Sequence, residues 1–156
     1  MSNTTFIGEF DCKLDAKGRL SLPAGLYKQL PEAQKEKFVV NRGIFQKCLI
    51  LYPLAAWEII MADLSKLNRF SKENDTFIRQ FSNGALEVEL DNANRLLIPK
   101  RLTDYASIEK DVVLSSSLNK IEIWSEKSYR ATMDNFDQTA FEMLAEKVMS
   151  KIEDNK

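Results

Sequence analysis

The chain has 156 residues, which suits one ordinary domain or two small similar units, and its hydrophobic fraction of 44% is enough for a packed core. The formal net charge of −1 does not indicate a nucleic-acid partner, so a DNA-binding surface would need its basic groups gathered on one face. The absence of histidine excludes Ser-His-Asp and Cys-His triads, and no pattern favours the carboxylate, lysine or tyrosine chemistry that stays formally open.

The first half begins with a predicted pair of strands joined by a tight turn. Residues 6–14 alternate apolar and polar side chains, which is typical of a half-buried strand. Lys17-Gly18 marks the reversal, because glycine adopts positive φ freely, and Leu20 and Leu22 resume the alternation. Pro23 ends this second strand and suits the first position of a short helix. Two further strands and a longer helix, which Pro53 opens, complete the half.

The helices are predicted from apolar stripes and capping residues. Ser71 suits the N-cap of a helix that Asn83-Gly84 closes, and Ser125 suits the N-cap of a later one. A last helix precedes a solvated end at residues 153–156. In chain order the stripes carry Trp57, Ile60, Met61 and Leu64; Phe77, Ile78 and Phe81; Tyr129 and Met133; then Phe136, Ala140, Met143, Leu144, Val148 and Ile152. We interpret these stripes as core or subunit packing.

The second half repeats the first. The segment from Leu14 to Pro23 aligns with the segment from Leu90 to Pro99 at an offset of 76 (91 minus 15), and Gly8 aligns with Gly84. Residues 85–90 alternate like the first strand, and Ala93-Asn94 takes the place of the first reversal, since asparagine also tolerates positive φ. Each copy is therefore predicted as strand, turn, strand, short helix, two more strands and a longer helix.

One short motif, Asp-x-x-x-Arg, recurs at the two turns, as Asp15–Arg19 and Asp91–Arg95. One interpretation is a structural ion pair that steadies each hairpin, although an exposed pair contributes only about 0–1 kcal/mol. The other is that each aspartate orients an arginine whose free donors face a partner. The planar guanidinium matches phosphate oxygens, or the O6/N7 edge of guanine, bidentately. From the residues alone the two interpretations carry similar weight.

Several segments together resemble the MraZ family of bacterial transcriptional regulators. They are residues 6–24, Leu51-Tyr52-Pro53-Leu54-x-x-Trp57-Glu58, and Asp91-x-x-x-Arg95-x-x-Ile98-Pro99. The likeness covers residues 5–129, and the C-terminal helix matches more in position than in residues. The resemblance implies an α+β fold in which two SpoVT-AbrB-type repeats, each a swapped-hairpin β unit, intertwine into one small barrel with flanking helices. It divides the chain into a first repeat with its helix (5–60), a connecting helical segment (61–82), a second repeat (83–132), and a C-terminal helix and tail (133–156).

The resemblance also implies a function. Proteins of this family form closed rings, usually of about eight subunits, that bind short direct repeats in double-stranded DNA upstream of the division and cell-wall gene cluster. Their motif arginines line the DNA-facing surface, so Arg19 and Arg95 are the predicted DNA-binding residues, with Asp15 and Asp91 as their orienting partners. The flanking basic residues expected to join them are Lys13, Lys17, Lys100 and Arg101. The alternative is a ring-forming protein-interaction scaffold whose Asp-x-x-x-Arg pairs are structural, and an enzyme is a distant third.

Two departures from the family pattern make the halves unequal. Asn94 stands where the family usually has glycine, which predicts either a looser turn or an αL residue held at some cost. Tyr27-Lys28 and Thr103-Asp104 replace a more typical arginine-bearing helix after each proline, and this weakens the basic face of the second half in particular. We therefore expect Arg19 to contribute more to DNA binding than Arg95.

The remaining features indicate a soluble cytoplasmic protein associated with the nucleoid. No apolar run approaches the roughly 18–20 residues that cross a bilayer, and the N-terminus lacks the features of a signal peptide. Cys12 and Cys48 lie in apolar runs and are expected to be buried hydrophobes rather than a disulfide. Without histidine or a CxxC pair, no metal or cofactor is expected.

Overall fold

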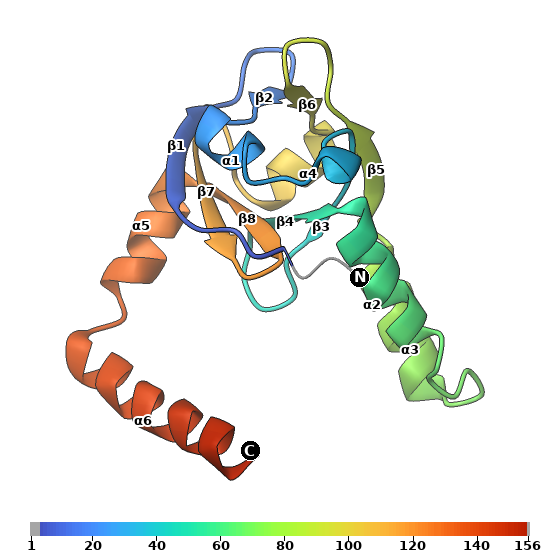
Figure 1. The fold of residues 1–156 in the computed structure, drawn as a ribbon, viewed down its shortest axis with the longest axis vertical. Coiled ribbons are helices and arrows are strands. Elements are labelled where there is room, and N and C mark those ends of the chain that lie inside the picture. Colours follow the sequence, from blue (N-terminus) through green and yellow to red (C-terminus); the bar gives the residue numbers. More distant parts are fainter. Residues whose placement is uncertain (1–3, 156) are drawn as a thin grey trace. The chain divides into compact units, whose positions relative to one another are not determined.

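A computed structural model describes residues 4–155 of the chain. Its strands are β1 (Glu9–Lys13), β2 (Arg19–Ser21), β3 (Lys37–Arg42), β4 (Leu49–Pro53), β5 (Leu86–Glu89), β6 (Arg95–Leu97), β7 (Asp111–Ser117) and β8 (Lys120–Ser125). Its helices are α1 (Ala24–Tyr27), a short 3-10 turn (Glu32–Gln34), α2 (Leu54–Leu64), α3 (Lys72–Ser82), α4 (Lys100–Tyr105), α5 (Glu126–Asp134) and α6 (Gln138–Asp154) (Figure 1). Residues up to Glu126 form one compact unit, and those from Lys127 onward form a second unit, described by itself.

The two copies exchange their first hairpins. β1 forms its ladder with β7 of the second copy, and β5 forms its ladder with β3 of the first copy. The second strands of the copies, β2 and β6, pair with each other, and all of these ladders are antiparallel. Strands of each half thus complete the sheet of the other half. The predicted α+β class with two swapped-hairpin repeats is confirmed.

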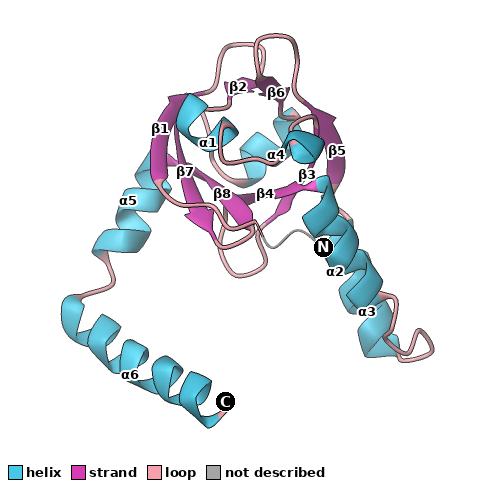
Figure 2. Ribbon diagram, viewed as in Figure 1, coloured by secondary structure: helices cyan, strands magenta, loops and turns pink. Residues whose placement is uncertain are grey.

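The strands make two sheets rather than one continuous barrel ladder in the described part of the chain. The larger sheet runs in the order β1-β7-β8-β4-β3-β5, and the smaller is the β2–β6 ribbon. Figure 2 shows the larger sheet curving from β1 round to β5, with the ribbon lying between these two edge strands. An isolated bridge between Leu14 and Leu20 links β2 to the chain leaving β1. The ribbon therefore bridges the open side of the curved sheet.

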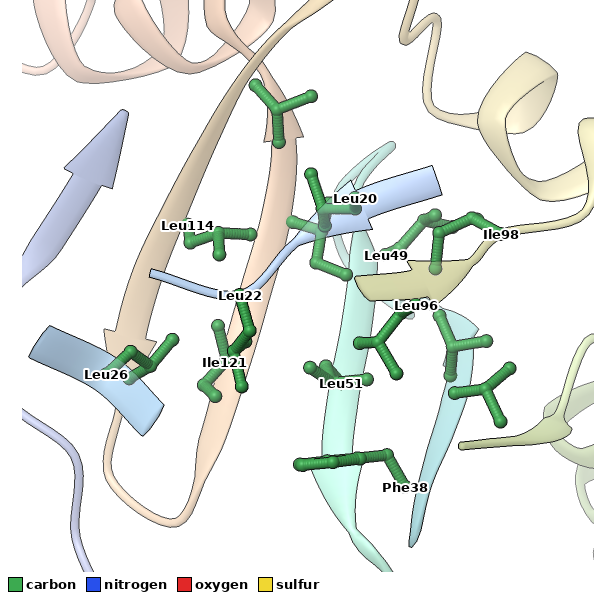
Figure 3. Packing of buried hydrophobic residues seen from close by; sticks show 14 of the residues in the cluster. Leu20, Leu22, Leu26, Phe38, Leu49, Leu51, Leu96, Ile98, Leu114 and Ile121 are labelled. Carbon is green, nitrogen blue, oxygen red and sulfur yellow. The ribbon is translucent and has the colours of Figure 1, made fainter. Parts of the chain in front are cut away.

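A single core lies under the ribbon. The inward side chains Leu20 and Leu96 are buried there, together with Leu22 and Ile98 from the residues that follow each strand. Figure 3 shows these side chains gathered with those of β4 and its neighbours. Pro23 and Pro99 have extended backbone angles and occupy the N-cap positions of α1 and α4, one residue before the first helical position that the sequence suggested. Because both copies contribute to the same hydrophobic cluster, neither copy has a core of its own.

Helices α2 and α3 begin at the residues that the sequence predicts. α2 begins directly after Pro53, and the Ser71 side chain accepts a hydrogen bond from the Asn74 N–H at 3.3 Å at the start of α3. One aromatic contact joins the two stripes, because the Trp57 and Phe81 rings stack with centroids 5.6 Å apart, whereas Phe77 of the same stripe is exposed. The connecting segment is therefore held to the sheet side of the fold by aromatic contacts that start at Tyr52.

The C-terminal unit contains most of α5 and the whole of α6. Asp137 caps α6 by accepting a hydrogen bond from the Ala140 N–H at 2.8 Å. The predicted apolar stripe is present, and Phe141, Leu144 and Val148 are exposed along it.

Both cysteines are free thiols. Burial raises the pKa of Cys12 and of Cys48 to about 12. Cys48 is buried, as predicted, whereas Cys12 is only half-buried against the core. Over the described residues, no helix combines the length and the apolar character needed to cross a membrane.

Candidate nucleic-acid interface

The outward face of the β2–β6 ribbon carries the residues that the motif analysis singled out. In the ribbon Arg19 pairs with Leu97, Leu20 with Leu96, and Ser21 with Arg95. Side chains alternate across a strand, so the central leucines point into the core while the other four side chains share the outer face. The exchange of hairpins thus brings Arg19 and Arg95, which are 76 positions apart in the sequence, onto one small surface.

Asp15 fixes the first turn and the guanidinium at the same time. Its Oδ1 atom accepts hydrogen bonds from the backbone N–H groups of Lys17 and Arg19, both at 2.9 Å. Its Oδ2 atom accepts from Arg19 Nε at 2.7 Å. The two terminal nitrogens of Arg19 have no hydrogen-bond partner among residues 4–155, and the side chain is 31% exposed. The aspartate therefore orients the arginine while leaving its outer donors available.

The second turn reproduces this arrangement. Asp91 accepts from the N–H groups of Ala93 and Arg95 and from Arg95 Nε, each at 2.9 Å, and the Arg95 side chain is 32% exposed. Asn94 has φ +57° where Gly18 has φ +83°. Of the two outcomes predicted for asparagine, the chain adopts the αL residue and not the looser turn. The two copies are therefore alike in backbone and in arginine geometry.

A third Asp-x-x-x-Arg, Asp75–Arg79, shows that the spacing alone does not define the site. It lies within helix α3, where residues four apart are neighbours on the helix surface. Here the terminal Nη2 of the arginine bonds to Asp75 Oδ2 at 2.6 Å. The helical pair thus uses an outer donor of the guanidinium, whereas the two turn pairs use Nε. Only at the turns does the pairing leave the whole outer edge of the guanidinium unbonded within the described residues.

Acid should weaken the turns through their aspartates. Hydrogen bonds, first from the Arg19 backbone N–H and then from its guanidinium, hold the pKa of Asp15 below its ordinary value of 3.8, and Arg95 does the same for Asp91. A carboxylate whose pKa is lower in the folded state than in the unfolded state stabilises the folded chain, and this contribution is complete above about pH 3.8. The contribution is lost as the pH falls through the lowered pKa. Asp15→Asn should therefore unfold more easily than the parent at neutral pH, with the gap narrowing in acid.

Denaturant titrations at neutral pH and well below pH 3.8 measure this gap. Glu87→Gln, which removes an exposed carboxylate from β5, is the matched control and should change stability little at either pH. An Asp15→Asn gap that is equal at both pH values would contradict the role of the ionised carboxylate.

Gly18 should not tolerate an ordinary side chain. Its φ is positive, and a Cβ there would lie 3.1 Å from the carbonyl oxygen of Ile98, whose N–H donates to the Gly18 carbonyl. Gly18→Ala should lower the free energy of unfolding by about 1–2 kcal/mol, the usual penalty of the left-handed region. Gly18→Asn is the control, because Asn94 already occupies the equivalent position, and it should lose less. Urea titrations compare them, and equal stability of both variants and the parent would contradict the prediction.

The flanking basic residues fall into two groups. Lys13 Nζ bonds to Asp111 at 2.9 Å, and this hydrogen bond raises the Lys13 pKa. Lys100 Nζ bonds to both carboxylate oxygens of Asp104 at 3.0 and 3.1 Å. Lys17 and Arg101 are exposed and form no ion pair within the part of the chain that the structure describes. The charges of Lys13 and Lys100 are thus partly offset by their own acids.

The exchange of hairpins also gathers basic side chains at one end of the ribbon. Lys17, from the first turn, and Lys100, which follows β6, line one hollow of about 470 Å³ beside Leu97 and Pro99. Glu87 and Glu89 of β5 line the same hollow, so its basic groups lie beside two carboxylates. At the other turn the aligned positions are Ala93 and Ala24. The predicted difference between the first and second copy is therefore a difference between two ends of a ribbon to which both copies contribute.

Two outward side chains of the ribbon, Ser21 and Leu97, were missed by the motif analysis. Both are exposed, and each lies two residues beyond a motif arginine on the same face. The period-two alternation of a strand was the available signal, because it places residues 19 and 21, and residues 95 and 97, on one side.

Known proteins of similar sequence share one family name. A family model described as "MraZ protein, putative antitoxin-like" matches the chain twice, at residues 5–80 and 81–151. The chain is 46% identical to the "Transcriptional regulator MraZ" of Flavobacterium psychrophilum over 151 residues, which are 97% of this chain and 96% of the relative. It is 48% identical to the protein of the same name from Christiangramia forsetii, over 92% of each chain. With the one from Clostridium beijerinckii it shares 42% identity over 92% of this chain and 96% of the relative. The resemblance predicted from the motifs is confirmed.

Proposed function

The chain belongs to the MraZ family, and from that premise we propose that it is a DNA-binding transcriptional regulator. It binds short direct repeats upstream of the division and cell-wall gene cluster, and the contacts are made by the outer face of the β2–β6 ribbon. The observation that carries the proposal is the pair of arginines on that face, each held at Nε with its terminal donors unbonded within residues 4–155. The relatives' names support a regulator rather than an enzyme.

A two-stranded ribbon suits the major groove of DNA, which admits this element as it admits a helix. The outer donors of Arg19 and Arg95 match the O6 and N7 acceptors of guanine or two phosphate oxygens. Asp15 and Asp91 act as positioning residues that limit each guanidinium to one direction. Lys17 and Arg101 contribute phosphate contacts, and Lys13 and Lys100 do so after partial release from Asp111 and Asp104.

The net charge of −1 requires many weak contacts rather than one strong contact. We propose that the chain forms a closed homo-oligomeric ring of about eight subunits that presents the ribbons in succession along the DNA. Once one ribbon is bound, the next repeat meets its ribbon at a high effective concentration. Rotationally related subunits present the same face repeatedly, which suits direct repeats and a protein associated with the nucleoid. We also propose that the chain divides into a first repeat with its helix (5–60), a connecting helical segment (61–82), a second repeat (83–132), and a C-terminal helix and tail (133–156).

A gel-shift titration on the protein's own upstream DNA tests the function. Each neutralised phosphate adds about 0.9 to the slope of log affinity against log salt, so about four contacts lower the affinity about a hundredfold between roughly 50 and 200 mM salt. Excess DNA without the repeats should compete poorly. The scaffold alternative gives the opposite result, in which a folded oligomer of the parent chain retains no DNA at either salt concentration.

A further inference from the structure

The outer face of the ribbon is symmetric in its arginines but not in the residues beside them. The aligned positions 21 and 97 hold Ser21 and Leu97, and each pairs across the ribbon with an arginine of the other copy. Leu97 lies opposite Arg19, and its side chain approaches Gly18 of the first turn. Leu97 is 60% exposed, although its neighbour Leu96 is fully buried. A large apolar side chain therefore stands on the outer face of the ribbon, between Arg95 of its own strand and Arg19 of the paired strand.

The charged residues beside the two ends of the ribbon differ as well. The end of the ribbon that carries Arg19 and Leu97 also carries Lys17 and Lys100, which line one hollow together with Glu87 and Glu89 of β5. The other end carries Arg95 and Ser21, with alanines at the positions aligned with the two lysines. A ribbon with two like ends would bind a DNA segment equally well in either direction. A ribbon whose two ends differ should bind the DNA segment more tightly in one direction than in the other.

The edges of the base pairs offer one apolar group in the major groove, the 5-methyl group of thymine. A leucine held between arginines on a major-groove surface is well placed for that group, whereas a serine hydroxyl hydrogen-bonds to several bases. We propose that Leu97 contacts a thymine methyl group in each bound repeat, and that the Leu97/Ser21 difference sets the direction in which the ribbon lies on DNA. This inference rests on the proposed function, because it assumes that the ribbon binds DNA.

Replacing thymine by deoxyuridine tests the contact, because it removes the methyl group and leaves every hydrogen-bonding atom in place. On repeats substituted one thymine at a time, the parent should bind about fourfold less tightly at one position, which corresponds to one methyl-sized apolar contact. Leu97→Ser places serine at both aligned positions of the ribbon, and the variant should bind thymine and uracil duplexes equally at that position. A Leu97→Ser protein that keeps the parent's discrimination overturns the proposal.

A second leucine provides the matched control. Leu86 on β5 lines the same hollow and is 38% exposed, but it is not on the ribbon. Leu86→Ser should keep both the parent's discrimination between thymine and uracil and its oligomeric state by light scattering. If Leu86→Ser and Leu97→Ser both change the oligomer and neither changes the discrimination, the exposed leucines cover a subunit contact and the inference is wrong. If the parent binds no DNA at all, the proposed function itself has failed, which is a different result.

The direction in which the ribbon lies on DNA is tested with a DNA fragment that carries several direct repeats, one of which is inverted in place. The parent should bind this array less tightly than the all-direct array and leave the inverted repeat unprotected in footprints. Leu97→Ser should narrow the difference, since its ribbon ends are alike in this residue. Equal protection of both arrays by the parent would overturn the assignment of direction.

Discussion

Arg19→Ala should lower the affinity for a single repeat by about ten- to a hundredfold, which corresponds to the loss of one bidentate arginine contact, and the loss should compound on an array that several subunits bind. Arg95→Ala should lower it less, because Arg95 stands at the ribbon end that lacks Lys17 and Lys100. The Arg19→Ala/Arg95→Ala double variant should bind the repeat DNA no more tightly than it binds DNA of unrelated sequence. Gel shifts and fluorescence anisotropy at fixed salt measure these losses, and circular dichroism checks that each variant is folded.

The chain supplies its own control for this experiment. Arg79 is also an arginine four residues after an aspartate, and its side chain is exposed, but it lies on helix α3 away from the ribbon. Arg79→Ala removes the same charge and the same type of ion pair, so it should leave the affinity for the repeats within about twofold. Equal losses for Arg79→Ala and Arg19→Ala would mean that only net charge matters.

Arg19→Lys tests whether DNA binding depends on the orientation of the Arg19 guanidinium or only on its positive charge. A lysine keeps the positive charge but lacks the planar fork, so it cannot donate to Asp15 through Nε while offering two further parallel donors outward. The variant should retain the salt dependence of the parent and lose most of the preference for repeats over unrelated DNA. Full specificity in Arg19→Lys would contradict the positioning role of Asp15.

The sequence predicts the local chemistry of this site well, because the local chemistry is encoded within ten residues. Alternation, turn residues and the prolines after β2 and β6 give the strands, the reversals and the short helices. The aspartate-to-arginine pairing follows from the same short range, and the Nε geometry at both turns favours the orienting interpretation. For Asn94 the sequence left two outcomes, and three hydrogen bonds to Asp91 keep its turn as tight as the first.

The alternation of apolar and polar residues predicts where the strands lie, but it does not predict which strands pair with each other. Nothing near Lys17 indicates that it lies beside Lys100, because that neighbourhood exists only once β2 pairs with β6 of the other copy. For the same reason the sequence assigned unequal contributions to the two copies, whereas the structure assigns unequal character to the two ends of a shared ribbon. The importance of Leu97 is also non-local, since its place opposite Arg19 is a property of the ladder register.

The shared core leads to the largest expected effect on stability. Leu96→Ala should lower the free energy of unfolding by roughly 3–5 kcal/mol, because Leu96 is fully buried under the ribbon and its loss leaves a cavity. Leu97→Ala, one residue further on, removes a mostly exposed leucine and should change stability by less than about 0.5 kcal/mol. Urea titrations at one protein concentration compare the two variants.

The exchange of hairpins also predicts which parts of the chain are destabilised by Leu96→Ala. Trp57 follows the sheet strands of the first copy, and Trp124 lies on β8 of the second, so Trp57→Phe and Trp124→Phe each leave one reporter. Leu96 belongs to the second copy, yet its ribbon pairs with β2 and its side chain lies in the cluster built by both copies. Leu96→Ala should therefore lower the unfolding midpoint equally for both reporters, in a single transition. A shift seen by Trp124 alone would mean that the copies unfold separately, which strands paired across the two halves do not allow.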